Sequence, residues 1–179
     1  MRSFKQRGLT VLFTLAMSVV ATACGRSEGE QLPEALCGTK VDRALLRPVL
    51  TSTDDLAEVN QLDRSEAISA PCTLYSDGKP VLRLHFYYSD AAPGLAGRSE
   101  FDPIFEDVSQ WRPVNIAEEA IVGRNGAIVS GPCIVGRNTH LIVELHLPEV
   151  RITDERRRKD IEKFMRAYFP AAVKALSCD

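Results

Sequence analysis

The cysteines constrain what this chain can fold into more than any other feature. The 179 residues contain five of them: Cys24, Cys37, Cys72, Cys133 and Cys178. Cys24 directly follows a hydrophobic run and three small residues, whereas the other four are spread over the rest of the chain. An even set of cysteines in an oxidising compartment predicts disulfides, and an odd set needs a separate explanation. The first question is therefore in which compartment the chain folds.

The amino terminus has the pattern of a signal peptide. Arg2, Lys5 and Arg7 precede residues 8–20, an uncharged and mostly apolar segment. This run is about a dozen residues long, and a helix that spans a bilayer needs about 20. We therefore expect residues 1–23 to be a cleaved signal peptide, and we favour this over a permanent transmembrane helix.

The residues at the expected cleavage point resemble a bacterial lipobox. Ala21-Thr22-Ala23-Cys24 follows its pattern, although Leu or Val is more usual at the position of Ala21. The resemblance implies that Cys24 becomes the mature amino terminus and that its sulfur receives a diacylglycerol group. Two acyl chains on one residue hold a protein at a membrane stably. The alternative is cleavage and release with a free thiol at Cys24.

The mature chain is expected to hold one domain behind a short tether. Residues 24–31 would be the lipidated cysteine and the tether, because residues 25–31 are small, polar and charged, and residues 32–179 suit a single domain in length. Removal of residues 1–23 takes away three basic residues and no acidic one, which leaves 19 basic against 24 acidic residues and a net charge of about −5. We expect no nucleic-acid partner, because phosphate binding needs a basic surface.

The four cysteines that remain once Cys24 is assigned to the lipid predict two disulfides. Three pairings are open. We favour Cys37–Cys72 with Cys133–Cys178, because Cys37 lies at the start of the first expected helix and Cys178 at the end of the last. Each could clip a helix to a strand, a structural role worth about 2–4 kcal/mol per bridge. A catalytic dithiol is more often a C-x-x-C pair, which the sequence lacks.

An internal repeat predicts the architecture. Residues 71–86 align with residues 132–147, because both segments open with Pro-Cys and His85 and His146 each follow their cysteine by thirteen positions. Both segments then end in alternating apolar residues, the pattern of a half-buried strand. The same unit of structure is therefore expected twice.

Each copy predicts a meander of three strands. The alignment extends backwards through Ser69 and Ser130, with one inserted residue. Asn125-Gly126 is the clearest hairpin signal, because both residues tolerate a positive φ. The period-two alternation directs Cys72 and Cys133 into the core. Turns are expected at four places: Asp63-Arg64-Ser65, Ser76-Asp77-Gly78, Gly123-Arg124-Asn125-Gly126 and Gly136-Arg137-Asn138.

Helices are expected to frame the meanders. The first covers about Val41 to Leu50, where Pro48 predicts an early kink or end. The last starts near Thr153 or Asp154, and Pro170 is expected to break it. A further helix is expected over Phe101 to Val108. The predicted fold class is therefore α+β: two three-stranded antiparallel β-meander repeats, which could form one continuous sheet, with helices packed on one face.

The chain as a whole resembles small secreted lipoproteins common in actinobacteria. The resemblance depends on the lipobox-like start, the segment LCGTKVDRALLRPVL (residues 36–50) after the tether, and the two Pro-Cys strands. It implies an uncharacterised four-cysteine domain that a lipid holds at the extracytoplasmic face of the cell membrane. It implies no catalytic residue.

The histidines form the strongest chemical constellation. His140, Glu144 and His146 share one face of the last strand, and His85 lies on the equivalent face of the first unit. If the two third strands are neighbours about a pseudo-twofold axis, His85 and His146 approach each other, and Glu144 or His140 would complete a zinc-type site. The alternative, which we favour, is a solvated sheet face whose matched histidines remain from a duplication.

The remaining motifs point away from catalysis. The sequence has no G-x-S-x-G motif, and residues 123–126 lie between strands rather than before a helix, where a phosphate loop would be. The basic run RRRK, residues 156–159, could meet anionic headgroups or wall polymers, but acidic neighbours partly neutralise it. Among the aromatic residues, Tyr87 and Trp111 are those expected to be exposed, where they could line a ligand groove.

The sequence thus predicts a lipoprotein anchored through Cys24, without a catalytic residue, metal or cofactor. Its expected role is a non-catalytic surface module that binds an envelope protein, peptide or polymer. The alternative is a zinc-type hydrolase that uses His85, Glu144 and His146.

Overall fold

The computed structural model describes residues 32–60, 69–95, 108–150 and 155–178. The expected signal peptide (residues 1–23), the expected lipidation site and tether (residues 24–31) and the expected turn at Asp63-Arg64-Ser65 lie outside these residues. So does the helix expected over Phe101 to Val108, apart from Val108 itself. These expectations therefore stay predictions.

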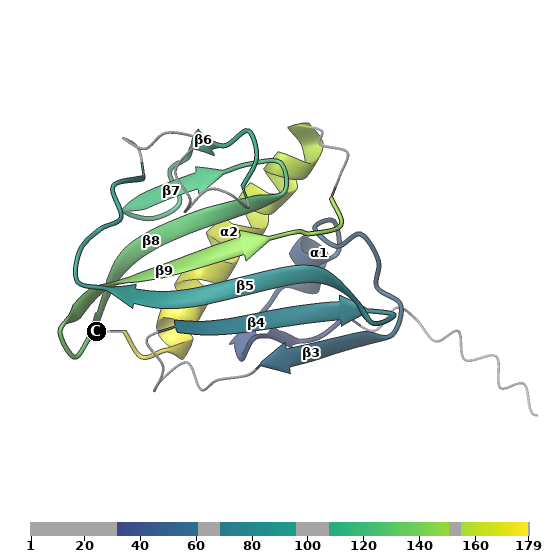
Figure 1. Cartoon of the computed structure of the whole chain (residues 1–179), viewed down its shortest axis with the longest axis horizontal. Helices are drawn as coiled ribbons and strands as arrows, with labels where there is room; N and C mark the ends of the chain where they lie inside the picture. The colour runs from purple at the N-terminus through teal and green to yellow at the C-terminus, as the bar shows by residue number, and fades with distance from the viewer. Residues whose placement is uncertain (1–31, 61–68, 96–107, 151–154, 179) are drawn as a thin grey trace, which may run out of the picture.

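A seven-stranded antiparallel sheet forms the centre of the fold (Figure 1). Its order is β3-β4-β5-β9-β8-β7-β6, so that β5 and β9, the last strands of the two expected meanders, are neighbours. A mixed fold built on one continuous antiparallel sheet is thereby confirmed. The strands are β3 (Leu56–Asn60), β4 (Ser69–Ser76), β5 (Lys79–Ser89), β6 (Arg112–Pro113), β7 (Glu119–Val122), β8 (Gly126–Val135) and β9 (Asn138–His146).

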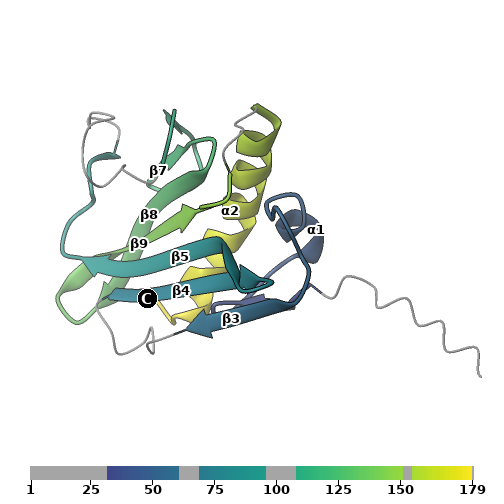
Figure 2. The ribbon, with the colours of Figure 1, turned by 45° about the vertical axis from the view of Figure 1, so that its right-hand side comes forward.

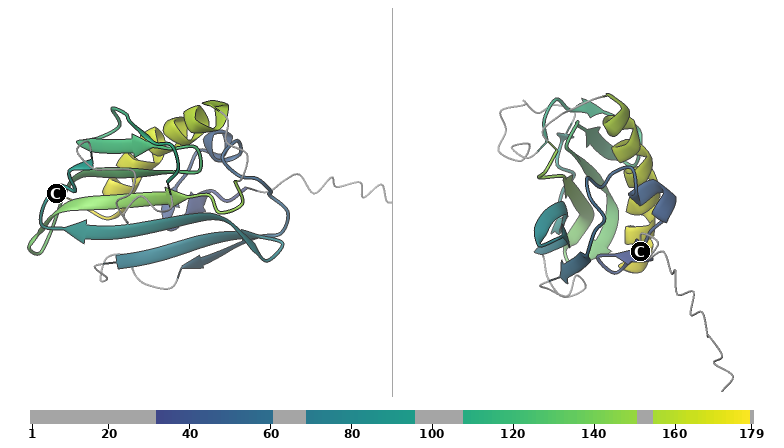
Figure 3. Two further views of the ribbon diagram at one scale, coloured as in Figure 1. Left: turned by 45° about the horizontal axis from the view of Figure 1, so that its top comes forward. Right: turned by 90° about the vertical axis from the view of Figure 1, so that its right-hand side faces the viewer.

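Two helices lie on the same face of this sheet. The long helix α2 (Glu155–Ala175) crosses it diagonally, and the short helix α1 (Arg43–Leu46) packs against α2 (Figures 2 and 3). A two-stranded sheet of β1 (Ala35–Leu36) and β2 (Thr39–Lys40) also packs against α2. The expected placement of the helices on one face is confirmed.

Helix α1 is shorter than the helix expected over Val41 to Leu50. Asp42 caps it, because its carboxylate accepts a hydrogen bond from the backbone N–H of Ala44 at 2.8 Å. The helix ends at Leu46, two residues before Pro48, because Pro48 has no N–H to donate to the carbonyl four residues earlier, although Arg47 between them still has a helical conformation. The early end predicted from Pro48 is therefore confirmed, and the full expected length is wrong.

Helix α2 runs through Pro170, so the predicted break at this residue is wrong. Pro170 is exposed, while Phe169 and Ala172 on either side of it are buried against the core. Burial of these neighbours stabilises the helix beyond the proline, although a proline in a helix interior removes one backbone hydrogen bond.

The carboxyl end of α2 closes with a Schellman motif. Ser177 has a φ of 53°, and its N–H donates to the Lys174 carbonyl, while the Cys178 N–H donates to the Val173 carbonyl. This reversal of the chain directs Cys178 back toward the sheet.

The main core lies between the sheet and α2. Cys72 and Leu74 of β4 are each only 1 % exposed, and Cys133 of β8 is fully buried, so the predicted inward direction of both cysteines is confirmed. The Tyr168 hydroxyl donates to the buried Leu36 carbonyl at 2.9 Å, which ties α2 to β1. The largest buried side chains of this core include Phe86, Leu84, Leu145, Phe164 and Tyr168.

The opposite face of the sheet is covered only in part. A second apolar cluster lies over β7, β8 and β9, where Tyr87 and Trp111 are partly buried against it. In the part of the chain that the structure describes, no helix has both the length and the hydrophobicity that crossing a membrane requires. The cluster consists of Leu95, Val108, Ile121, Ile128 and Ile142.

The expected turns are present in the described residues, but one has a different cause. Asp77 and Gly78 both have a positive φ, as a two-residue hairpin turn of type I′ requires, and Gly136 has a φ of 61°. Neither Asn125 nor Gly126 has a positive φ, so the reason given for that hairpin is wrong. Gly126 is required instead because a Cβ there would collide with the Leu145 carbonyl oxygen of the neighbouring strand.

Candidate functional site

The uncovered part of the sheet, on the side away from the helices, is the candidate functional surface. We call it the open face. It consists of outward positions on β3, β4, β5 and β9, and the pairing of these strands decides which side chains meet. Glu144 of β9 lies directly opposite His85 of β5, and Ser69 of β4 lies opposite Tyr87.

A chain of polar contacts crosses three strands of the open face. The Ser69 hydroxyl lies 2.6 Å from His85 Nε2, and His85 Nδ1 lies 3.7 Å from Glu144 Oε2. The Tyr87 hydroxyl donates to the other oxygen of Glu144, Oε1, at 2.8 Å. We call Ser69, His85, Glu144 and Tyr87 the relay.

The carboxylate determines the direction of the hydrogen bond in the relay. A negative charge near Nδ1 favours the tautomer that carries its proton on Nδ1. Nε2 of His85 then has a lone pair, so the Ser69 hydroxyl donates to it. The 3.7 Å between His85 Nδ1 and Glu144 Oε2 is longer than a hydrogen bond, so the carboxylate influences the imidazole through its charge. Tyr87 and the ring contact between His85 and Tyr87, at 5.3 Å between centroids, limit the movement of both partners.

The relay is accessible to solvent. Ser69 is exposed, and the side chains of His85 and Glu144 are 42 % and 26 % exposed. The relay residues do not line either of the two described surface pockets. A molecule that meets the relay must therefore lie on the open face.

His146 lies on the open face two residues after Glu144 on β9, opposite Arg83 of β5 and Gly126 of β8. In the strand register His85 is therefore paired with Glu144, and His146 is paired with Arg83. Within the described residues, the only three potential metal ligands within 4.8 Å of one another are Cys37, Glu58 and Cys72, and the two sulfurs among them are bonded to each other. The expected convergence of His85, Glu144 and His146 into a three-ligand site is not present in this part of the chain.

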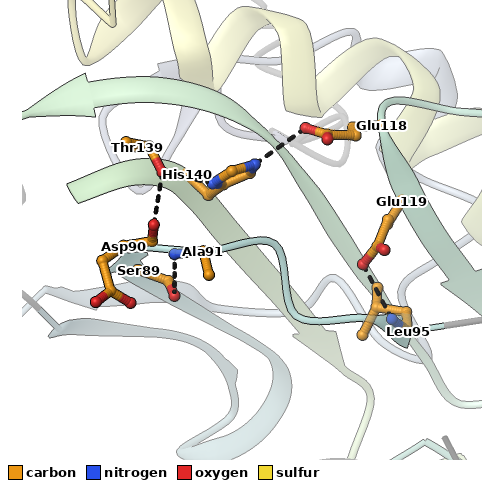
Figure 4. Close-up of polar contacts among 8 residues, drawn as sticks. All are labelled: Ser89, Asp90, Ala91, Leu95, Glu118, Glu119, Thr139 and His140. Atoms are coloured by element: carbon orange, nitrogen blue, oxygen red, sulfur yellow. Dashed lines mark hydrogen bonds and ion pairs between the residues drawn. The ribbon is translucent and has the colours of Figure 1, made fainter. Parts of the chain in front are cut away.

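His140 lies at the far end of the same strand (Figure 4). Its Nε2 is 3.1 Å from Glu118 Oε2, and its Nδ1 is 2.8 Å from the Thr139 hydroxyl. Thr139 donates to the Asp90 carbonyl, and the Leu95 N–H donates to Glu119 at 2.9 Å. These contacts hold the segment after β5 over the sheet and separate His140 from the relay.

Both disulfides have the pairing that we favoured. Cys37 and Cys72 are bonded, with their Cα atoms 6.0 Å apart, and Cys133 and Cys178 are bonded, with their Cα atoms 4.6 Å apart. The first ties the β1–β2 hairpin to β4, and the second ties the end of α2 to β8. The Cys37 N–H also donates to the Glu58 carboxylate at 2.7 Å.

The basic run at residues 156–159 is divided between surface and interior. Arg158 is only 6 % exposed, pairs with Glu155 at 2.9 Å and donates to the Gln110 carbonyl at 3.3 Å. Arg157 donates to the Val49 carbonyl at 3.1 Å. Two of the four basic residues therefore have structural contacts, which leaves little of the basic patch considered from the sequence.

The aromatic residues follow the expected division between core and exposed positions only in part. Phe86 and Tyr88 are buried in the main core. Tyr87 and Trp111 are half-buried against the second apolar cluster rather than fully exposed, and Tyr87 has its hydroxyl in the relay.

A second polar feature of the surface is a pocket near the β4–β5 turn. Its lining includes Ser52 and Ser76, whose hydroxyls lie 2.8 Å apart, and Ser76 also donates to the Asp54 carbonyl at 2.6 Å. The polar groups of this pocket thus stabilise the loop before β3.

Ser69 is the relay residue that sequence reasoning missed. It lies three positions before Cys72 in the segment Ser-Ala-Pro-Cys, and Ser130 lies three before Cys133 in Ser-Gly-Pro-Cys. This repeated S-x-P-C pattern was the available signal. Whether the serine of this pattern contacts a histidine depends on strand register, which the pattern alone does not reveal.

Comparison with known proteins found no matching family model, no matching curated protein and no matching solved structure.

Proposed function

We propose that the chain is a cell-envelope lipoprotein, anchored through Cys24, that presents the open face as a surface binding module. The observation that carries this proposal is the edge strand β3, whose outer side pairs with no residue that the structure describes, next to a sheet face that the helices α1 and α2 leave uncovered. The lipid anchor itself is supported by the lipobox-like segment before Cys24 and by the oxidised state of the other four cysteines.

Strand β3 has the properties of a docking edge. It is the first strand of the sheet, and no described residue pairs with its outer side. Four of its five residues are exposed, and Val59 is 43 % exposed on the open face. Natural edges are usually protected by charged side chains, Pro or a bulge. Strand β3 has no Lys or Pro, and its one charged residue, Glu58, accepts a hydrogen bond from the Cys37 N–H. So weakly protected an edge favours the addition of a strand from another molecule.

The ligand that fits both features is an extended segment of an envelope protein. Its backbone would pair with β3, and its side chains would contact the row formed by Val59, Thr73 and Arg83, which lie opposite one another on neighbouring strands. A wall polymer could contact the open face, but it has no backbone amides to extend the sheet. We therefore commit to a peptide segment.

We also propose that the sheet arose by duplication of a three-stranded unit, which the internal repeat of the sequence records. The pairing of β5 with β9 supports a twofold relation, because His85 faces Glu144 while His146 faces Arg83, and both Arg83 and Glu144 follow their repeat's cysteine by eleven positions. The hairpin registers differ, however, because the second turn comes two positions earlier relative to its cysteine.

Site-directed photo-crosslinking in the cells that make the protein tests this function. We expect Val59→p-benzoylphenylalanine to yield discrete protein cross-links, because position 59 lies at the docking edge. Ile134 is the matched control, since it is the other exposed large hydrophobic residue of the described chain, at 60 %, and lies on β8. Excess purified wild-type protein should suppress the cross-link, and the Val59→Lys variant should not.

Two outcomes contradict the proposal. Equal cross-linking from positions 59 and 134 would show that the contacts are not specific to the edge. A product from position 59 that glycan hydrolases remove and proteases do not would assign the ligand to a polymer.

A further inference from the structure

The relay has the arrangement of an activated nucleophile, which goes beyond binding. We propose that Ser69 is the nucleophile of an acyl-transfer site, with His85 as its general base and Glu144 as the residue that positions His85. The substrate class is a carboxylic ester carried by a large, surface-exposed molecule.

Three contacts in the structure follow the order of groups in such a site. The nucleophile is hydrogen-bonded to the base, at 2.6 Å between Ser69 Oγ and His85 Nε2. The base has a carboxylate on its other nitrogen, at 3.7 Å. The carboxylate is itself held by the Tyr87 hydroxyl at 2.8 Å, so each member of the relay is positioned by the next.

The second unit of the chain shows that this arrangement is specific to the first. Ser69 lies opposite Tyr87, which is two residues from His85 on the same face, so the hydroxyl reaches the ring. Ser130 lies opposite Ile142, four residues from His146, and is fully buried with no hydrogen-bond partner for its hydroxyl among the described residues. The same residue types therefore form a relay in one unit only.

The strand register also differs between the two histidines. His85 lies opposite Glu144, whereas the equivalent His146 lies opposite Arg83. Duplication alone would not explain why the surroundings of the two histidines differ. The Ser69 hydroxyl and the Glu144 carboxylate therefore both indicate His85 as the base.

The chemistry balances without a cofactor. Ser69 Oγ attacks the ester carbonyl carbon as its proton passes to His85 Nε2. The bond between that carbon and the alcohol oxygen breaks, and the alcohol leaves with the proton from His85. Water, deprotonated by His85, then attacks the acyl carbon on Ser69. The bond between that carbon and Ser69 Oγ breaks, Oγ takes the proton back from His85, and the carboxylic acid leaves.

The substrate class follows from the position of the relay. Ser69 is exposed, and the relay lies on the open face outside both described pockets. An exposed nucleophile can be reached by a group on a large molecule that lies across the open face, whereas small substrates are usually enclosed by concave sites.

Labelling of the full-length lipoprotein in detergent with an alkyl fluorophosphonate tests the proposal. The Ser69 oxygen displaces fluoride from phosphorus, and peptide mass spectrometry locates the adduct. We expect stoichiometric labelling at Ser69, none in Ser69→Ala, and a rate at least about 100-fold lower in His85→Ala, the smallest usual effect of a general base. Ser130→Ala and His146→Ala are the matched controls and should label at the wild-type rate.

The role of Glu144 is tested by its two conservative variants. Glu144→Gln should lower the labelling rate, because it removes the charge but keeps the shape, and Glu144→Asp should restore part of it. Equal stability of both variants in urea shows that the effect is not a loss of folding. A rate that does not change in Glu144→Gln would overturn its positioning role.

Failure of this inference is distinguishable from failure of the binding function. Wild-type labelling no faster than that of Ser69→Ala, or a rate unaffected by His85→Ala, would overturn the nucleophile. Ser69→Ala keeps the β3 edge, so it should retain the cross-link from position 59 under either result.

Discussion

Arg158 shows how a single buried charge holds two distant parts of the chain together. Its guanidinium pairs with Glu155 one helical turn earlier and donates to the carbonyl of Gln110, which lies before β6. Both contacts are shielded, because the side chain is only 7 % exposed. The residue therefore fixes the start of α2 against the segment that leads into β6.

We expect Arg158→Ala to lower the free energy of unfolding by about 1–3 kcal/mol, because it removes a hydrogen bond from a charged group and leaves the Gln110 carbonyl without its donor. Arg156→Ala is the matched control in the same basic run. Arg156 is exposed, so its removal should change stability by no more than about 0.5 kcal/mol. Urea unfolding of both variants measures the difference. Equal effects of the two substitutions would contradict a structural role for Arg158.

The sequence predicted some single-residue roles and could not predict others. The inward direction of Cys72 and Cys133 followed from alternation alone. Their partners were predicted from expected helix ends at Cys37 and Cys178, which is correct for Cys178 and wrong for Cys37, because Cys37 lies in the β1–β2 hairpin. The partner of Ser69 depends on the register between β4 and β5, which a turn two residues longer or shorter would change. Gly126 was recognised as a turn residue, but its close contact with the Leu145 carbonyl depends on a strand 19 positions later.

Helix α2 tolerates a proline because packing on both sides of it outweighs the local cost. Pro170 has no N–H to donate to the Arg166 carbonyl, four residues earlier. Phe169 and Ala172 are nevertheless buried, and the disulfide at Cys178 holds the end of the helix to β8. Local propensity is therefore overridden by tertiary contacts.

We expect Pro170→Ala to raise the free energy of unfolding by about 1–2 kcal/mol, since it restores the missing hydrogen bond and loses part of that gain to a more flexible unfolded chain. Pro170 is exposed, so the substitution removes no buried contact. Lys163→Ala, at another exposed position of α2, is the control and should have little effect. A loss of stability in Pro170→Ala would show instead that the core requires the proline's bend.

The ends of the helices were the least predictable feature at this scale. The existence of α2 was predictable, because the sequence has Ile161, Phe164, Met165 and Tyr168 at helical spacing and all four are buried. Its length was wrong because Cys178 and the Schellman motif extend the structure beyond Pro170. The short elements β1, β2 and β6 have two residues each and carry no periodic signal.

At the scale of the molecule, the sheet separates a covered face from an open one. The helices and both disulfides lie on the covered face, and the relay and the Val59 row lie on the other. Alternation along β5 and β9 predicted this division, since a strand directs successive side chains to opposite faces. The order of the strands could be predicted only if the pairing of β5 with β9 was known. The repeat suggested this pairing but did not determine it.

The open face can be presented at a membrane surface only if the chain is lipidated. A lipid on Cys24 would hold the domain through residues 25–31, the tether expected from the sequence. The disulfides do not depend on lipidation, but they do require an oxidising compartment. Export and lipidation are therefore the central claim on which the proposed surface function depends.

Intact-mass spectrometry of the protein, extracted from the membranes of the cells that make it, tests that claim most directly. We predict a mature chain that begins at Cys24, carries the mass of a diacylglycerol on that residue and has no free thiol among Cys37, Cys72, Cys133 and Cys178. A chain that begins elsewhere, lacks acyl mass or contains free thiols at these four positions would contradict the account.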